Sequence, residues 1–284
     1  MAPAQAAKTP GSDTFRPLQV SELGGEAQAI RRNIVRMIQA ANLGHIGGDL
    51  SVSDILTTLF LSILRVDPAN PQWEARDRFI LSKGHCAAAL YSVLARRGFI
   101  EEAELATFMK PLSRLNGHPN RRKVPGVEAN TGPLGHGLPI AVGAAIGAQI
   151  RKLDYRVFCV TGDGEMQEGS NWEAAMYAGH RKLKNLTLVT DRNGLQQGAR
   201  TSETNDLTPL GDKMAAFGWE VREVDGHDHA ALHDALSRPG ENKPVFVLAR
   251  TIKGKGVSFI EDRVEWHHKV PNDEQVAQAL EELA

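Results

Sequence analysis

Apolar positions in the first third of the chain recur three and four residues apart, which is the spacing of an amphipathic helix. The first such run has its apolar positions at Ile30, Ile34, Met37 and Ile38. We expect Gly44 to supply the left-handed residue that stops this helix. Ser51 and Asp54 resemble a capping box that opens a second helix through Leu64, and a third helix is expected at about 85–97. This part of the chain predicts three helices before any clear strand.

Residues 1–24 show no apolar period and are rich in Ala, Pro, Gln and Gly. Such a composition buries too little apolar surface to order the backbone, so we expect a flexible N-terminal tail. After residue 24 the sequence contains no linker, repeat or low-complexity tract. Residues 25–284 are therefore expected to form a single domain.

From residue 156 onward, short β-branched and aromatic runs alternate with helical patterns. The runs that predict strands are 156–161, 186–190, 219–224 and 245–250. The helical patterns between them cover 168–181, 209–217 and 229–237. In the second of these helices, Thr208 is the expected cap and Gly218 the expected stop. Because such alternation is typical of an α/β fold, we expect a doubly wound, mostly parallel sheet with helices on both faces.

Charge and composition argue against several classes of protein. The 33 Lys and Arg residues and 34 Asp and Glu residues give a net charge of −1, which leaves no excess positive charge for a nucleic acid. The longest nearly apolar stretch, Ile55–Leu64, is shorter than the roughly 20 residues that cross a bilayer. Two cysteines, and first residues without the apolar segment of a secretory signal, indicate a reducing compartment. We expect a cytoplasmic protein that binds neither nucleic acid nor membrane.

Two polar clusters follow neighbouring strands of the predicted sheet, where an α/β fold binds its ligands. Gly162–Gly169 (GDGEMQEG) follows the first strand, and Asp191–Leu195 (DRNGL) follows the next. The Asp163 carboxylate, the Asn193 amide oxygen and a nearby backbone carbonyl form an all-oxygen set that suits Mg²⁺ or Ca²⁺. A GDG sequence alone is often an ordinary Asx turn. Asn193, however, lies 30 residues after Asp163, which is the spacing of the thiamine diphosphate fingerprint.

Histidines in glycine-rich or turn segments give a second signal. These are His45, His85, His118, His136, His267 and His268. A single loop histidine is more often a surface residue, but four of these six directly follow a glycine, which makes coincidence less convincing. Neutral imidazoles that donate and accept hydrogen bonds suit a substrate with many hydroxyls and can transfer protons. A second set, His227, His229 and His233, is interpreted as surface or helix-capping residues.

Two further features of the sequence are a KGKG segment and two cysteines. Lys253–Gly256 (KGKG) follows the last strand, and could be a mobile segment that covers phosphate or a solvated basic turn. Cys86 and Cys159 have no neighbours that would activate a thiolate, so we expect small buried apolar residues.

Seven motifs, taken together, resemble the transketolase family, and the resemblance runs from about Phe15 to Pro271. In chain order they are GHIGGDLS, LSKGHCAAALY, NGHPN, ANTGPLGHGL, GDGEMQEGSNWEA, DRNGLQ and KGKGVSFIED. The chain is similar only to the N-terminal, diphosphate-binding half, as in the first subunit of a split bacterial transketolase. The resemblance implies thiamine diphosphate, Mg²⁺, and transfer of a two-carbon ketol unit from a ketose to an aldose.

The resemblance also implies roles for individual residues. Asp163, Asn193 and the carbonyl of Leu195 match the metal ligands. His45, His118 and His267 match catalytic histidines that line the substrate channel, and Glu168 matches a carboxylate that links two cofactor sites across a dimer. The residues expected to contact the cofactor are His85, Gly132, Leu134, Gly162, Asp163, Gly164, Glu165, Asn193 and His267. Leu134 among them would flank the thiazolium ring.

Two departures from the family pattern affect this assignment. The loop that follows Asn193 is one residue shorter than usual, and Gln197 stands where an apolar residue often packs on the thiazolium. The WHH sequence leaves a choice between His267 and His268, of which alignment to the common WH pattern favours His267.

The resemblance implies a second polypeptide, because nothing in this chain matches the pyrimidine-binding domain. In the family that domain supplies a glutamate to the cofactor and most contacts to the substrate phosphate. We therefore expect an obligate partner of about 300 residues in an α2β2 assembly, with sugar substrates. A pentose phosphate, apulose 4-phosphate and a sulfonated sugar all remain open as substrates.

Two other functions remain as alternatives. The α subunit of a 2-oxoacid dehydrogenase has a similar GDG loop but decarboxylates its substrate, and the histidine-rich loops favour ketol transfer over it. A non-catalytic transketolase-like subunit is the other alternative, and the intact candidate histidines argue against it.

Overall fold

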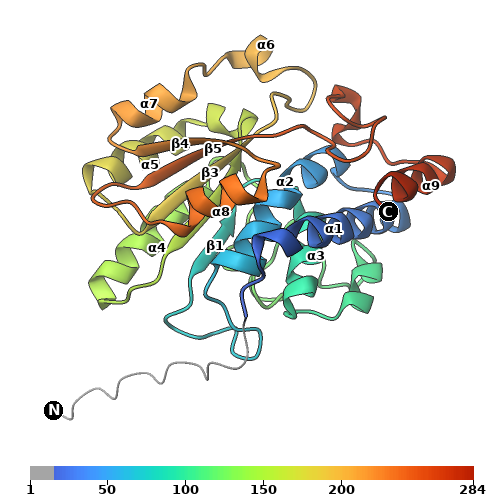
Figure 1. Ribbon diagram of the computed structural model, residues 1–284, viewed down its shortest axis with the longest axis horizontal. Coiled ribbons are helices and arrows are strands. Elements are labelled where there is room, and N and C mark those ends of the chain that lie inside the picture. Colours follow the sequence, from blue (N-terminus) through green and yellow to red (C-terminus); the bar gives the residue numbers. More distant parts are fainter. Residues whose placement is uncertain (1–15) are drawn as a thin grey trace.

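Five parallel strands form one sheet in the order β1-β2-β3-β5-β4 (Figure 1). The computed structural model describes residues 16–284. The strands are β1 Arg78–Leu81, β2 Val157–Gly162, β3 Leu186–Arg192, β4 Glu220–Asp225 and β5 Val245–Arg250. Each pair of neighbours is parallel. The predicted α/β fold with a parallel sheet is confirmed.

Helices pack on both faces of this sheet (Figure 1). One face carries α1 Val20–Ala41, α2 Ile46–Thr58, α3 Ala87–Arg97 and α8 His229–Ser237, and α9 Asp273–Glu282 packs on α1. The other face carries α4 Gly137–Arg151, α5 Gly169–His180 and α7 Leu210–Ala216. Shorter helical segments are α6 Thr201–Asn205, a π-helical turn Leu59–Ile63, and 3₁₀ turns at Glu102–Thr107, Gly164–Gln167 and Val264–His267. Of the helices on the second face, α4 was not predicted.

Alternating side chains of the central strands enter two hydrophobic cores. In β2, Phe158 and Val160 join the core under α1–α3 and α8, whereas Val157 and Cys159 join the core under α4, α5 and α7. Because successive strand residues point to opposite faces, a sheet covered on both sides must be apolar at every position. This explains the continuous apolar runs from which the strands were predicted.

The N-terminal helical region differs from its prediction in two places. The helix α1 already begins at Val20, so the prediction of a flexible tail is wrong for residues 20–24. Residues 1–15 of the predicted tail lie outside the described residues. Leu23 is fully buried, and this packing outweighs the poor helix propensity of Gly24 and Gly25. Asn42, not Gly44, takes the left-handed conformation that ends the helix.

The prediction of a capping box at Ser51 and Asp54 is also wrong, because α2 begins at Ile46 and both residues lie inside it. Their side chains instead make tertiary contacts, to Asp191 and to Arg31. Strand β1 precedes α3, contrary to the expectation of three helices before any strand, because four residues are too few to show a period. In α7, the N-cap is Pro209 rather than Thr208, and Gly218 is left-handed after the helix end as expected.

The stretch Ile46–Ile63, formed by α2 and the π-helical turn, is long and apolar enough to cross a membrane by composition alone. However, 89% of it is buried inside the fold. Core packing against α1 and α3 therefore accounts for its apolar character.

Candidate active site

A cavity of about 370 Å³ opens at the carboxyl ends of β2 and β3, where polar residues were expected. Its lining comes from the N-terminus of α2, the loops after β1, β2, β3 and β5, the segment before α4, and the turn before α9. The lining residues other than glycine are His45, Lys83, His85, Leu134, Asp163, Glu165, Gln167, Glu168, Asn193, Leu195, Gln196, Gln197, Lys253, His267 and His268. Backbone of Gly48, Gly132, Gly162 and Gly164 completes it.

The two oxygen-bearing residues predicted to share a cation, Asp163 and Asn193, lie at this cavity. Asp163 Oδ2 accepts a hydrogen bond of 2.7 Å from the backbone of Gly194, the residue next to Asn193. Asn193 Oδ1 accepts a 3.1 Å bond from the backbone of Leu195, so the amide oxygen is turned toward its own loop. Parallel pairing of β2 and β3 brings these two loops together, as expected from their positions after neighbouring strands.

Burial raises the pKa of Asp163 to about 6, although amide hydrogen bonds from Gly194 and Gly164 oppose the shift. A buried carboxylate with this environment lacks sufficient positive charge in the protein alone. A divalent cation between this carboxylate, the Asn193 amide and the Leu195 carbonyl would supply it. The residues present therefore fit a hard metal ion.

Glu165 lines the cavity but directs its carboxylate to protein donors. It accepts hydrogen bonds from the backbone of Gly135 at 3.0 Å and of Gly162 at 3.1 Å, and a short one from the Ser82 hydroxyl. This ties the turn that carries Leu134 to the loop that carries Asp163. Leu134 itself is exposed in the cavity, where an apolar cofactor ring can pack on it.

Four histidines that line the cavity lie close together. The ring centroids of His45 and His85 lie 5.1 Å apart, and those of His45 and His267 lie 5.4 Å apart. Burial, followed by the charges of neighbouring groups, lowers the pKa of His45 to about 4 and of His267 to about 3, and lowers the pKa of His85 well below its ordinary value. These imidazoles are therefore neutral at pH 7, the form that both donates and accepts a hydrogen bond. His268 also lines the cavity, with its ring centroid 4.0 Å from that of His45.

Two lysines at the base of the cavity were not among the predicted site residues. Lys83 Nζ forms a buried ion pair of 2.5 Å with Asp191, and Lys253 Nζ lies 2.8 Å from Nδ1 of His267. Lys253 is only 2% exposed, so the alternative of a solvated basic turn is wrong for this residue. Lys83 directly precedes the GH pair that contains His85, and this adjacency could have identified it.

Some predicted residues lie elsewhere. His118 is outside the cavity lining, although its ring would lie 3.2 Å from a Cβ placed on Gly132. His136 is exposed at the start of α4. Cys86 and Cys159 are buried, as expected.

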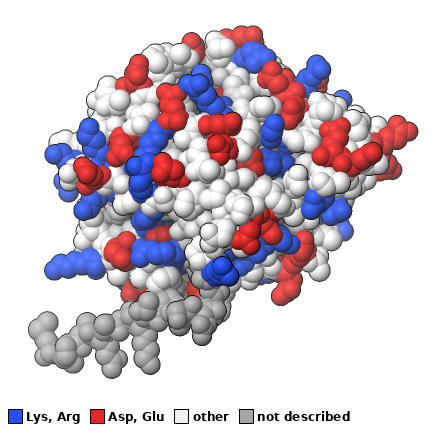
Figure 2. All heavy atoms as spheres, in the orientation of Figure 1, with Lys and Arg blue, Asp and Glu red and all other residues white. Residues whose placement is uncertain are grey.

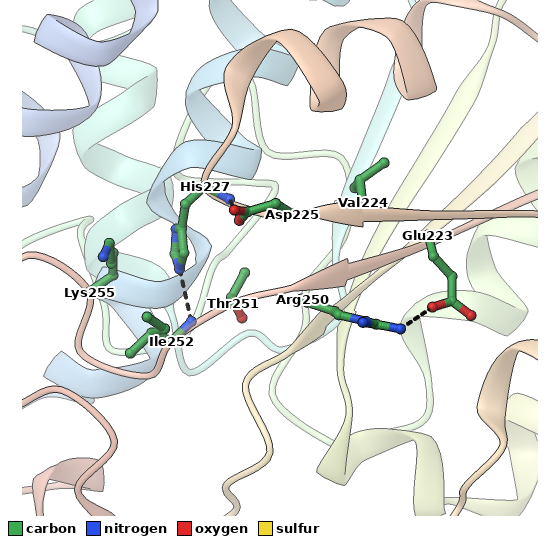
Figure 3. Close-up of a pocket in the computed structure, with 8 residues that line it drawn as sticks. All are labelled: Glu223, Val224, Asp225, His227, Arg250, Thr251, Ile252 and Lys255. Carbon is green, nitrogen blue, oxygen red and sulfur yellow. Dashed lines mark hydrogen bonds and ion pairs between the residues drawn. The ribbon is translucent and has the colours of Figure 1, made fainter.

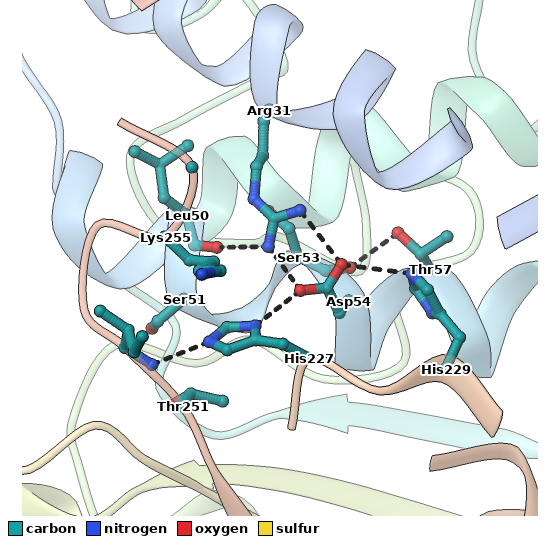
Figure 4. Close-up of polar contacts among 12 residues, drawn as sticks. Arg31, Leu50, Ser51, Ser53, Asp54, Thr57, His227, His229, Thr251 and Lys255 are labelled. Carbon is teal, nitrogen blue, oxygen red and sulfur yellow. Dashed lines mark hydrogen bonds and ion pairs between the residues drawn. The ribbon is translucent and has the colours of Figure 1, made fainter. Parts of the chain in front are cut away.

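The interpretation of His227 and His229 as surface or capping residues is wrong. Both rings contact the buried carboxylate of Asp54 (Figure 4), at 2.7 Å for His227 and 3.3 Å for His229. The cap of α8 is Asp228, which accepts from the backbone of Ala230 and Ala231. A charged side chain buried by tertiary packing cannot be recognised from local sequence, and this made the two histidines look peripheral.

A second cavity, of about 550 Å³, lies at the ends of β4 and β5 (Figure 3). It is lined by His227, Ile252 and Lys255, and by the ion pair between Arg250 and Glu223. On the face of the molecule in Figure 2, basic and acidic side chains are interspersed. This mixture agrees with the balanced net charge.

Comparison with known proteins places this geometry in a family. The family described as "Transketolase, thiamine diphosphate binding domain" matches residues 25–284. An apulose-4-phosphate transketolase subunit from Actinobacillus succinogenes is 48% identical, over 94% of this chain and 97% of that protein. The 6-deoxy-6-sulfo-D-fructose transketolase subunit SqwG of a Clostridium species is 39% identical, over 93% and 97%.

A solved structure, the transketolase of Campylobacter jejuni, superimposes with a TM-score of 0.87 at 32% identity, over 94% of this chain but 43% of that one. The chain thus spans less than half of a full-length transketolase but nearly all of two proteins named as transketolase subunits. The match at residues 25–284, together with these relatives, shows that the chain belongs to the transketolase family, as its thiamine diphosphate binding domain.

Proposed function

We propose that this chain is the N-terminal subunit of a split transketolase, which binds thiamine diphosphate through Mg²⁺. With a separate C-terminal subunit it transfers a two-carbon ketol unit from a ketose to an aldose. The observation that carries the proposal is one cavity that combines the oxygen donors of Asp163 and Asn193 with neutral histidines. Thiamine diphosphate, when bound, supplies the electron sink that stabilises negative charge on the transferred unit.

The chain's own residues have separable tasks in this proposal. Asp163, Asn193 and the Leu195 carbonyl would hold Mg²⁺, or Ca²⁺ in its place, and the ion would neutralise charge on the diphosphate. The backbone of Gly162 and Gly164 lets the diphosphate approach closely. His85 faces the diphosphate end of the cavity.

The remaining residues act on the ring and the substrate. Leu134 would pack beside the thiazolium ring. His45 and His267 donate or accept protons at sugar hydroxyls, since neutral imidazoles can do both. His118, next to Gly132, would act at the outer end of the channel.

The partner would supply the pyrimidine-binding domain in an α2β2 assembly in the cytoplasm. Support comes from coverage: the chain covers 97% of the Actinobacillus succinogenes relative, which is named as a subunit, and 43% of the Campylobacter jejuni transketolase. Glu168 is exposed at the cavity, where it can reach a second chain. A carboxylate in this position suits the linking role that the family resemblance implies.

The donor to test first is apulose 4-phosphate, because the 48% and 42% identical relatives carry that substrate in their names. A sulfonated fructose and a pentose phosphate are the other donors in the panel. Contacts to the distal end of the sugar are expected on the partner chain, so the reconstituted pair is required.

The test is co-purification of this chain with a candidate C-terminal transketolase subunit from the same organism, followed by assays of product formation with each ketose and an aldose acceptor. The proposal predicts ketol transfer by the pair and none by either chain alone. Full transfer by the isolated chain contradicts the need for a partner. Release of CO₂ from pyruvate without ketol transfer would instead support a 2-oxoacid dehydrogenase subunit.

A further inference from the structure

The Asp54 carboxylate of α2 contacts side chains from α1 and from the start of α8. Its two oxygens accept from Arg31 of α1 at 3.1 and 2.5 Å, and from the rings of His227 and His229 at the start of α8 (Figure 4). Burial alone would raise the pKa of this carboxyl, but the bonds from His227, His229 and Arg31 hold it well below its usual range. Asp54 is therefore a fixed anion inside the fold.

His227 has a second bond on its other side. Its Nε2 lies 2.8 Å from the backbone nitrogen of Ile252, just after β5 (Figure 3). Because a backbone N–H can only donate, Nε2 must accept, and the ring proton must sit on Nδ1. Nδ1 then donates to Asp54 at 2.7 Å. The two contacts together define one tautomer of a neutral ring.

The Ile252 bond lies at the entry of the segment that carries Lys253 into the cavity. The side chains of Ile252 and Lys255 border the 550 Å³ cavity, and Ile252 is 37% exposed, so little packing supports this side of the segment. Hydrogen bonds hold it instead: Gly254 N donates to Gly47 O at 2.9 Å, and Lys253 O accepts from Asp262 N at 3.0 Å. His227 adds a side-chain hydrogen bond at Ile252, directly before Lys253, next to the bond that the Thr251 hydroxyl donates to Asp191.

We propose that His227 is a positioning residue of the active site: in its Nδ1–H tautomer it links the Asp54 carboxylate to the Ile252 amide and thereby holds Lys253 Nζ on His267. The link runs from α2, which carries His45 at its N-terminus, to the β5 loop that carries Lys253. The Asp54 carboxylate thus sets the position of the β5 loop relative to the N-terminus of α2.

Two substitutions test the two hydrogen bonds of the His227 ring separately, one to Asp54 and one from Ile252. Asn places its amide near the position of Nδ1, so His227→Asn keeps a donor to Asp54 and loses the acceptor for Ile252. Gln places its amide near Nε2, so His227→Gln keeps an acceptor for Ile252. The matched control is His233→Asn on α8, one turn after His229.

The first readout is hydrogen exchange of the Ile252 amide in the full chain, which does not depend on activity. We expect exchange about tenfold faster in His227→Asn, and within about threefold of the original chain in His227→Gln and His233→Asn. Equal protection in the Asn and Gln variants overturns the proposal. If His227→Asn does not fold, ¹H–¹⁵N spectra of the unchanged chain decide: an Nδ1–H ring supports the proposal, and an Nε2–H ring overturns it.

The second readout is turnover by the reconstituted pair, and this part rests on the proposed function. We expect kcat to fall about tenfold in His227→Asn, to recover in His227→Gln, and to show no additional loss when His227→Asn is combined with Lys253→Met. Independent, multiplying losses in the double variant contradict action through Lys253. Absence of ketol transfer in the unchanged pair would reject the proposed function while leaving the exchange result to decide on His227.

Discussion

Lys253 Nζ lies 2.8 Å from Nδ1 of His267, and the two residues reach the same cavity from opposite ends of the segment that follows β5. Burial, and then the nearby charge of Lys83, lower the pKa of Lys253 to about 8. When Lys253 is charged it donates to Nδ1, and the other nitrogen of His267 must then carry the ring proton. The lysine therefore fixes which nitrogen of His267 can donate to a substrate hydroxyl.

Replacing either His45 or His267 by alanine should lower turnover without weakening the binding of thiamine diphosphate. For His45→Ala and His267→Ala in the reconstituted pair, we expect thiamine diphosphate affinity within about threefold and kcat lower by about 100-fold, because general acid–base groups contribute that much. Steady-state kinetics and calorimetry measure the two effects. His233→Ala is the control, and an unchanged kcat in His267→Ala would remove this residue from the proton transfers.

Asp49 should make stability depend on pH. Burial raises its pKa to about 8, with Oδ2 lacking a hydrogen-bond partner among the described residues. Because the folded-state pKa is above the unfolded value of 3.8, the unfolded chain loses its proton first. The contribution of Asp49 to the free energy of unfolding is therefore fully present below about pH 4 and is lost as pH rises toward 8.

The variant Asp49→Asn imitates the neutral acid and keeps the bond from Ala89 N to Oδ1. We expect it to be more stable than the original chain at pH 8, with the difference shrinking toward pH 4. Urea unfolding at several pH values measures this. A difference that does not change with pH would show that Asp49 is not the titrating group.

The buried ion pair between Lys83 and Asp191 should be costly to break. Burial opposes ionisation of Asp191, but Lys83 and hydrogen bonds from Thr251 and Ser51 lower the pKa of its carboxyl. Lys83→Met leaves that charge without its cation, and we expect a loss of about 3–5 kcal/mol in the free energy of unfolding. Lys184→Met, at an exposed lysine, is the control. A loss below about 1 kcal/mol for Lys83→Met would mean that the pair is not desolvated as described.

The two cysteines should resist thiol reagents in the folded chain. Cys86 and Cys159 are both buried, and burial raises the pKa of the Cys86 thiol well above its ordinary value. Since the thiolate is the reactive form, we expect no modification by a disulfide reagent at pH 8 until the chain is unfolded. Mass spectrometry after timed exposure measures this, and rapid labelling of Cys86 under native conditions would contradict its position in the core.

Short-range patterns predicted the fold well where each element carries its own signal. The strands β2, β3 and β5 are buried on both faces, so their apolar runs were unambiguous. The four-residue β1 and the glycine-containing α4 gave no such signal, because β1 is short and α4 is apolar on several sides. Tertiary packing determines the conformation of both segments, and local sequence propensity does not report it.

At the candidate site, too, local sequence predicted some residues, and others depend on tertiary contacts. Asp163 and Asn193 could be predicted because parallel neighbouring strands bring their carboxyl ends together whatever the rest of the fold does. His227 follows the end of β4 and had the same positional signal, but its buried partner Asp54 lies 173 residues away and had been assigned to a helix cap. Long-range ion pairs of this kind become visible only in three dimensions.

The proposed function depends most on Asp163, which would hold the divalent ion at the diphosphate. The most direct measurement is calorimetry of thiamine diphosphate binding to the reconstituted pair, with and without Mg²⁺, for the original chain, Asp163→Asn and the exposed-site control Asp212→Asn. We predict Mg²⁺-dependent binding in the original chain and in Asp212→Asn, and a loss of at least about 100-fold in Asp163→Asn. Equal affinity in all three proteins, or binding that does not respond to Mg²⁺, would contradict the account.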